Sequence, residues 1–361
     1  MEASTVFNCK TGTRSAASAF ALYRPERPVR LRAFMRLAVV LFAGLMSLLT
    51  ALAQNPLSNL EHFPLSGSDY VRLADWAKAF NFQIHSARQS EEMQLTNAGA
   101  RLVFTLESQR AEINGVTVLL SSPVLARNGI VYIAVVDLQT VLQPVLFPPK
   151  NTGSASVLCV CLDPGHGGKD PGNQEGRRQE KAYTLLLARE VRSLLTRAGL
   201  KVILTRNGDN FLPLPDRPEY ARRRGADLFV SLHFNASLVD KNHVKGFEVY
   251  CLTPPGASST NARGDTADTT AFAGNQFDGK NMLLAYQIQK AMVTSLPVDD
   301  RGVKHARFAV LRNARVPAVL VEAGFMSHPQ ESERIFNPDF RRQLASAIAE
   351  GILAYKRWVE R

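Results

Sequence analysis

From Val157 onward, short apolar runs alternate with stretches of helical spacing, and this alternation constrains the fold more than any other feature. The runs with the length and apolar character of strands are residues 157–162, 201–205, 227–232, 246–252 and 318–321. Continuous apolar runs separated by amphipathic helices indicate a mostly parallel sheet that is buried on both faces. We therefore predict an α/β domain over residues 157–361, with a twisted, largely parallel sheet and helices on both faces.

The helices between these runs follow from their apolar spacing. The segment 180–198 carries apolar residues along one stripe, and Gly199 is suited to end it. The other predicted helices are residues 216–224, 283–296 and 340–358. Residues 253–280 are rich in Gly, Ala, Thr and Asn, which predicts a long loop.

A smaller segment with a different pattern precedes this domain. Residues 70–82 have helical spacing, and Asn-Gly pairs at 114–115 and 128–129 indicate tight hairpin turns. We predict a small α+β module over residues 65–143. The Pro-, Gly- and Ser-rich stretch 144–156 is interpreted as a linker.

The first 53 residues resemble a targeting segment more than a folded element. The stretch 35–53 has a basic start, a short apolar core and small residues near Ala53, as in a secretory signal peptide. A retained membrane anchor is the alternative, but the apolar run is short for spanning. Because signal peptides begin at the initiator, Met35 is the hypothetical true start. Residues 1–34 are then a mispredicted upstream stretch, or else a long basic extension.

Charge and cysteine content limit the partners and the redox chemistry. Residues 1–53 hold seven Lys and Arg against two Asp and Glu, so about +6 of the formal +11 belongs to the remainder. Such a surface suits an anionic polymer such as a cell wall, and no motif indicates nucleic acid. The mature part keeps Cys159, Cys161 and Cys251. An odd number disfavours a full disulfide framework, although one bridge to Cys251 stays open.

Four polar residues occupy positions where a parallel sheet places its ligand sites. His166 and His233 follow apolar runs, Glu180 opens a helix, and Glu322 ends the run 318–321. Two imidazoles and a carboxylate suit zinc, which lowers the pKa of bound water from ~15.7 to about 7. Glu322 is then a candidate general base.

Each of these residues also has a plain structural explanation. Glu180 alone fits a helix-start acid stabilised by the helix dipole, and His233 alone fits a hydrogen-bonded histidine at a strand end. Glu322 alone fits a structural acid paired with arginine. Their joint placement at converging positions favours the metal interpretation.

The stretch 157–355 resembles the zinc-dependent N-acetylmuramoyl-L-alanine amidases of bacterial cell walls. The segments that carry the resemblance are 163–172 (DPGHGGKDPG), Glu180-Lys181, 231–236 (SLHFNA), 246–250 (GFEVY) and 321–327 (VEAGFMS). The resemblance implies one Zn²⁺ per catalytic domain, held by His166, Glu180 and His233, with Glu322 as the catalytic acid/base. It also implies cleavage of the amide between N-acetylmuramic acid and L-alanine in peptidoglycan.

The chain departs from this family pattern at two positions where relatives usually carry asparagine. Arg222 lies on a predicted helix, where we expect it to alter local hydrogen bonds. For His328 we favour a surface role over a contact with substrate. Some relatives carry an inhibitory helix near residues 253–280, but the composition here favours a substrate-side loop. The module 65–143 weakly resembles the small amino-terminal module of copper amine oxidases, without implying copper.

The leading hypothesis is therefore an exported peptidoglycan amidase of the periplasm or cell envelope. A zinc peptidase acting on the stem peptide is a second hypothesis, and an inactive wall-binding relative is a third. The module 65–143 is a candidate contact for the cell wall or for an activator.

Overall fold

The computed structural model describes residues 56–361 apart from 86–90, 154 and 262–267. The predicted extension 1–34 and signal peptide 35–53 lie outside the described residues. Residues Pro56–Arg361 form one compact unit. None of the helices in the described ranges combines the length and the apolar character that a membrane crossing requires.

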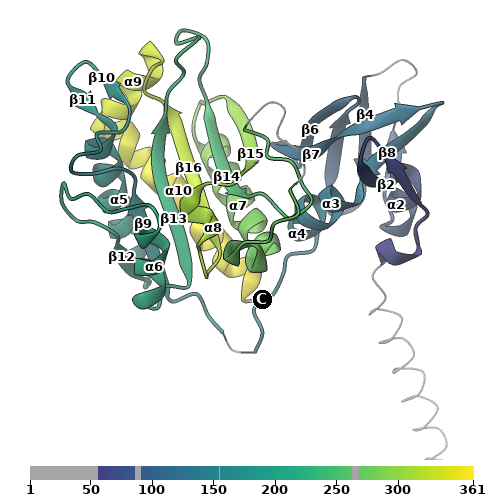
Figure 1. Ribbon diagram of the computed structural model, residues 1–361, viewed down its shortest axis with the longest axis horizontal. Helices are drawn as coiled ribbons and strands as arrows, with labels where there is room; N and C mark the ends of the chain where they lie inside the picture. The colour runs from purple at the N-terminus through teal and green to yellow at the C-terminus, as the bar shows by residue number, and fades with distance from the viewer. Residues whose placement is uncertain (1–55, 86–90, 154, 262–267) are drawn as a thin grey trace, which may run out of the picture. The chain divides into compact units, whose positions relative to one another are not determined.

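The main sheet of the larger domain is largely parallel, as predicted. Its strands run in the order β12, β9, β13, β16, β14, β15 (Figure 1). The first four strands are mutually parallel, and β14 joins β16 in the antiparallel sense. The bounds are β9 Cys159–Pro164, β12 Lys201–Leu204, β13 Leu228–Asn235, β14 Phe247–Leu252, β15 Asp300–Ala306 and β16 Ala318–Phe325.

Helices cover both faces of this sheet, which confirms the predicted α/β class. The larger core cluster unites one face with α5 (Glu180–Arg197), α7 (Asp278–Ser295) and α10 (Pro338–Val359). A smaller cluster joins the other face to α6 (Asp216–Arg223) and α8 (Ala309–Arg312). A sheet that is buried on both faces needs apolar residues at successive strand positions, and all six residues of β9 are buried.

Several elements differ from the sequence expectations. Helix α7 begins at Asp278, inside the stretch 253–280 that was expected to be a loop, and the short 3₁₀ helix η3 (Ala273–Phe277) precedes it. Strand β15 and helix α9 (Pro329–Phe336) were not predicted. The strand escapes detection because its sequence, DRGVKHA, contains no apolar run.

The amino-terminal module is an α+β unit, as predicted. Both Asn-Gly pairs form hairpin turns with positive φ, 50° and 79° at residues 114 and 115 and 52° and 77° at 128 and 129. Its elements are η1 Pro56–Asn59, β1 His62–Leu65, β2 Ser68–Arg72, α2 Leu73–Ala79, β3 Gln83–His85, β4 Glu92–Thr96, β5 Arg101–Thr105, β6 Ser108–Ile113, β7 Val116–Arg127, β8 Ile130–Ala134, α3 Val135–Asp137, the π-helix η2 Leu138–Leu142 and α4 Gln143–Leu146.

Two boundaries in the module differ from the predictions. Tyr70 belongs to β2, so the helix expected over 70–82 is shorter and begins at Leu73. Helix α4 extends to Leu146, so the helical end of the module reaches into the stretch 144–156 that was interpreted as a linker. The module also meets the larger domain, because β7 pairs with β15 at Val118 and Val303.

The three cysteines among the described residues are buried and free. Cys159 and Cys161 lie in the same cluster on one face of the sheet, as expected for strand residues two apart. Cys251 lies in the larger cluster. The bridge to Cys251 that the sequence left open is therefore not formed.

Packing between α7 and α10 gives a stability prediction. A Cβ atom at Gly351 would lie 2.5 Å from the Cα of Ile288, which is backbone and cannot rotate away. We expect Gly351→Ala to lower the free energy of unfolding by about 1–3 kcal/mol, as overpacking does. Chemical denaturation monitored by circular dichroism measures this change.

Gly279→Ala is the matched control, because it places the same methyl group in α7 at 3.6 Å from its nearest neighbour, an ordinary contact. There we expect no change, or a gain of less than about 1 kcal/mol from helix propensity. Equal losses in both variants would contradict the packing argument.

Candidate metal centre and neighbouring carboxylates

The carboxyl ends of the central strands bring the predicted residues to one edge of the sheet. His233 and Glu322 are direct partners in the parallel ladder between β13 and β16. Residues in register on neighbouring strands project to the same face. The loop after β9 carries His166, and α5 begins at Glu180.

His166, Glu180 and His233 form one compact group. Within the described part of the chain, they are the only such cluster whose ligand atoms all lie within 4.8 Å of one another. Nε2 of His166 is 3.0 Å from Oε2 of Glu180, and Nδ1 of His233 is 3.0 Å from Oε1. Two imidazole nitrogens and a carboxylate are a donor set that can hold a metal ion.

Glu180 is the centre of this group and is almost completely buried, with 1% of its side chain exposed. Backbone N–H groups of Asn173 and Phe234 donate to its two oxygens at 2.9 and 3.0 Å. Burial opposes ionisation, but the hydrogen bonds from His166 and His233 hold the pKa of Glu180 well below its ordinary value. The carboxylate is therefore ionised and needs positive charge beside it.

Asp170 orients His166. Its Oδ2 lies 2.9 Å from Nδ1 of His166, which turns Nε2 toward Glu180. Burial lowers the pKa of His166, and the two carboxylates together raise it above its usual value. Metal-binding histidines commonly have a carboxylate on the second ring nitrogen. Asp170 lies in the segment DPGHGGKDPG, but nothing in that segment indicates its contact with the His166 ring from sequence alone.

The backbone around these rings leaves no room for side chains. A Cβ atom at Gly165 would lie 2.2 Å from Cε1 of His233, and one at Gly172 would lie 2.6 Å from Cδ2 of His166. His166 itself has a φ of 62°, a conformation that few residues with side chains adopt. The glycine-rich sequence is thus required by the close approach of both imidazoles.

Two buried arginines fix the loop that follows β9, and sequence reasoning missed both. Arg206 donates to the carbonyls of Pro164 and Gly165 at 2.9 and 2.8 Å. Arg217 donates to the carbonyl of His166 and to the buried carboxylate of Asp163, both at 2.9 Å. From sequence alone such residues look like surface charges, because nothing in their spacing marks them as buried.

Glu322 has the environment of a proton-exchanging group. Within the described residues, its buried Oε2 atom has no hydrogen-bond partner. Burial, followed by the nearby charges of Glu180 and Glu248, raises the pKa of Glu322 well above its ordinary value, while Lys304 acts in the opposite direction. A raised pKa makes the carboxylate of Glu322 a stronger proton acceptor than that of an ordinary glutamate.

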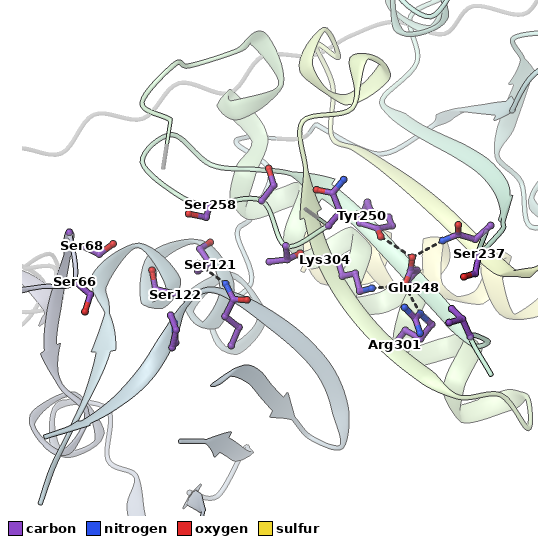
Figure 2. Close-up of a pocket in the computed structure, with 18 of the residues that line it drawn as sticks. Ser66, Ser68, Ser121, Ser122, Ser237, Glu248, Tyr250, Ser258, Arg301 and Lys304 are labelled. Atoms are coloured by element: carbon purple, nitrogen blue, oxygen red, sulfur yellow. Dashed lines mark hydrogen bonds and ion pairs between the residues drawn. The ribbon is translucent and has the colours of Figure 1, made fainter. Parts of the chain in front are cut away.

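Glu248 lies on the other side of Glu322, in register with it across β14 and β16. This carboxylate is buried and fully hydrogen-bonded (Figure 2). Its donors are Asn235 at 2.8 Å, Tyr250 at 2.8 Å, Arg301 at 2.7 Å and Lys304 at 2.5 Å. A cavity of about 960 Å³ opens beside this cluster, and neither His166 nor His233 lines it.

The two departures from the family pattern have local roles. Arg222 is exposed and pairs with Glu219 on α6. His328 is only 5% exposed, so the expected surface role is wrong. Its ring accepts from the backbone N–H of Glu331 at 3.4 Å and caps the start of α9.

Comparison with known proteins gives one consistent family. The family model described as N-acetylmuramoyl-L-alanine amidase matches residues 160–354. The amidase AmiA of Escherichia coli is 36% identical over 238 residues, which cover 59% of this chain and 81% of that protein. AmiC of Neisseria meningitidis is 35% identical over 218 residues, covering 54% and 52%.

Among solved structures, an amidase from Clostridium difficile 630 aligns with a TM-score of 0.47 and 31% identity, covering 56% of this chain and 97% of that one. AmiC2 of Nostoc punctiforme aligns with a TM-score of 0.47 and 33% identity, covering 57% and 99%. The family match does not reach residues 65–143, and the resemblance to the copper amine oxidase module is not borne out.

The contact between Gly165 and His233 gives a testable prediction. Gly165→Ala would force the imidazole of His233 away from Glu180. We expect Zn²⁺ affinity to fall by at least about tenfold, as when groups that orient metal ligands are lost. Competition with a chromophoric chelator measures this affinity.

Gly208→Ala is the control, because the nearest atom to its Cβ would be 3.7 Å away. It should bind the metal as the unmodified protein does. Wild-type affinity in a folded Gly165→Ala protein would show that the imidazole is not positioned by this contact.

Proposed function

Because the chain belongs to the N-acetylmuramoyl-L-alanine amidase family, we propose that it hydrolyses the amide between N-acetylmuramic acid and L-alanine in peptidoglycan, using zinc and a glutamate base. The observation that carries the proposal is the His166–Glu180–His233 group with Glu322 in register beside it. Ligand donors next to a carboxyl with a raised pKa suit metal-assisted hydrolysis.

The residues present fit one zinc ion. Glu180 is an ionised buried carboxylate, and the two imidazoles beside it are held by Asp170 and by the close approach to Gly165. His166, Glu180 and His233 would hold the ion, as a three-residue catalytic zinc site does. When bound, zinc supplies Lewis acidity toward the scissile carbonyl and acidifies a water molecule.

Glu322 moves the protons in this proposal. Its carboxylate takes a proton from the attacking water and then delivers it to the nitrogen of the departing L-alanine. Protonating the amine matters because an unprotonated amide nitrogen is a poor leaving group. Burial of Glu322 and its neighbouring carboxylates raise its pKa, which makes it a better proton acceptor and lets it keep the proton until the amide bond breaks.

We also propose where the protein acts and what it contacts. The apolar stretch before Ala53 supports export to the periplasm or cell envelope. Residues 65–143 are proposed to contact the cell wall or an activator, and no nucleic-acid partner is proposed.

A zinc peptidase would cut within the stem peptide, and an inactive relative would cut nothing. Mass spectrometry of muropeptides therefore separates the three hypotheses.

The first test replaces the proposed base. Glu322→Gln keeps the size of the side chain but cannot accept a proton, so we expect turnover of purified sacculi to fall by about 10²–10⁴-fold. Zinc content should remain at the wild-type level, because Glu322 is not a proposed ligand. Dye release from labelled sacculi and elemental analysis measure the two quantities.

Glu350→Gln, which removes an exposed carboxylate from α10, serves as the control and should retain full activity. Substantial amidase activity in Glu322→Gln would rule out its role as the base.

The second test removes the metal or one ligand. Dialysis against a chelator should abolish turnover, and added Zn²⁺ should restore it. His233→Ala should lose both zinc and activity. His243→Ala, whose side chain is 83% exposed on a nearby loop, should lose neither. Activity that survives complete loss of metal would contradict the zinc mechanism.

A further inference from the structure

The cavity beside Glu248 is a candidate substrate subsite. It has a volume of about 960 Å³ and is lined by Glu248, Tyr250, Arg301 and Lys304 (Figure 2). Serines 258 and 259, from the loop after β14, and serines 66, 68, 121 and 122 of the module also line it. The lining is therefore rich in hydrogen-bond donors and contains two cations.

This cavity adjoins the reaction centre. Glu248 and Glu322 are direct partners across β14 and β16, and such partners have Cβ atoms about 4.5–5.5 Å apart. Asn235, which also lines the cavity, is two residues beyond His233 on β13. A ligand in the cavity would thus extend from an amide held at Glu322 along the ends of β14 and β15.

The charges of the cavity do not cancel. Arg301 and Lys304 both pair with the single carboxylate of Glu248, which leaves one positive charge in excess among these three. Nε of Arg301 bonds to Glu248, and Nη1 reaches only the carbonyl of Lys245, at 3.4 Å. Within the described residues Nη2 has no hydrogen-bond partner, and 32% of the Arg301 side chain is exposed.

Arg301 is also held in place for binding. Its guanidinium lies 5.0 Å from the centre of the Phe325 ring, at the end of β16. The ring and the bond to Glu248 together restrict the side chain, which is one of those that line the cavity. A fixed guanidinium with a free edge suits a carboxylate, because two N–H groups can donate in parallel.

On the basis of the proposed function, we infer that this cavity binds the stem-peptide arm of the substrate, with Arg301 and Lys304 receiving a peptide carboxylate. The two arms at the scissile amide differ in charge. The glycan arm presents mainly neutral hydroxyl and acetamido groups, whereas the peptide arm carries free carboxylates. The excess positive charge therefore selects the peptide arm.

A kinetic cycle tests this inference. Muramoyl peptides with free carboxylates are compared with the same peptides whose carboxylates are amidated. For the wild-type protein we expect kcat/KM to be about tenfold lower on the amidated substrate, as for loss of one charge-assisted hydrogen bond. Arg301→Gln should lower kcat/KM on the free-carboxylate substrate and abolish this preference. Arg301→Lys should retain part of it, because the charge remains.

Lys245→Gln is the matched control, because it removes a cation close to Arg301 that does not line the cavity. It should keep the full preference. If Arg301 only neutralises Glu248, its loss will slow both substrates equally and the preference will persist, which would overturn the inference. The absence of any preference in the wild-type protein would also overturn it.

A binding measurement separates this inference from the proposed reaction. Calorimetry with Glu322→Gln and the free stem peptide should show binding that weakens about tenfold when Arg301→Gln is added. This result does not depend on turnover, so it can hold even if the proposed reaction fails. Binding of peptide-free glycan that depends on Arg301 would place the other arm in the cavity and overturn the inference.

Discussion

The buried carboxylate of Glu180 is the constraint around which the site is built. A charge with 1% exposure requires compensation, and the chain supplies two imidazoles and two backbone N–H groups around its oxygens. The donors come from the loop after β9 and from β13, and the acceptor Glu180 begins α5. These elements must therefore meet at one point. The positive φ of His166 and the bare backbone at Gly165 follow from that convergence.

The site residues at the ends of strands could be predicted from the sequence, but the residues that hold them in place through hydrogen bonds could not. His166, His233 and Glu322 follow apolar runs, so a parallel sheet necessarily carries them to one edge. Arg217 could not be predicted in this way, because the Asp163 carboxylate and the backbone carbonyls that it contacts beside the site are distant in the chain. Strand β15 was missed for a related reason. Two of its charged residues, Arg301 and Lys304, pair with Glu248, a partner that only the folded sheet provides.

Sheet register also explains why Glu322 differs from an ordinary glutamate. His233, Glu322 and Glu248 occupy one row across β13, β16 and β14. The charge of Glu248, one of the two outer members, raises the pKa of Glu322. Burial lowers the tendency of Glu322 to ionise, and two neighbouring carboxylates lower it further. A shift of one residue in either ladder would remove this environment.

Glu180 and Glu248, on the two sides of Glu322, have their charges balanced by different kinds of group. This difference would favour one orientation of a bound substrate over the other. Glu180 is balanced by imidazoles that are good metal donors, so that side suits an ion and the carbonyl it polarises. Glu248 is balanced by Arg301 and Lys304, which do not bind metals but do bind carboxylates. A substrate that is neutral at one arm and anionic at the other would be oriented by this asymmetry alone. Such an orientation would place the amide nitrogen of the substrate where the proposed proton transfer from Glu322 has to reach it.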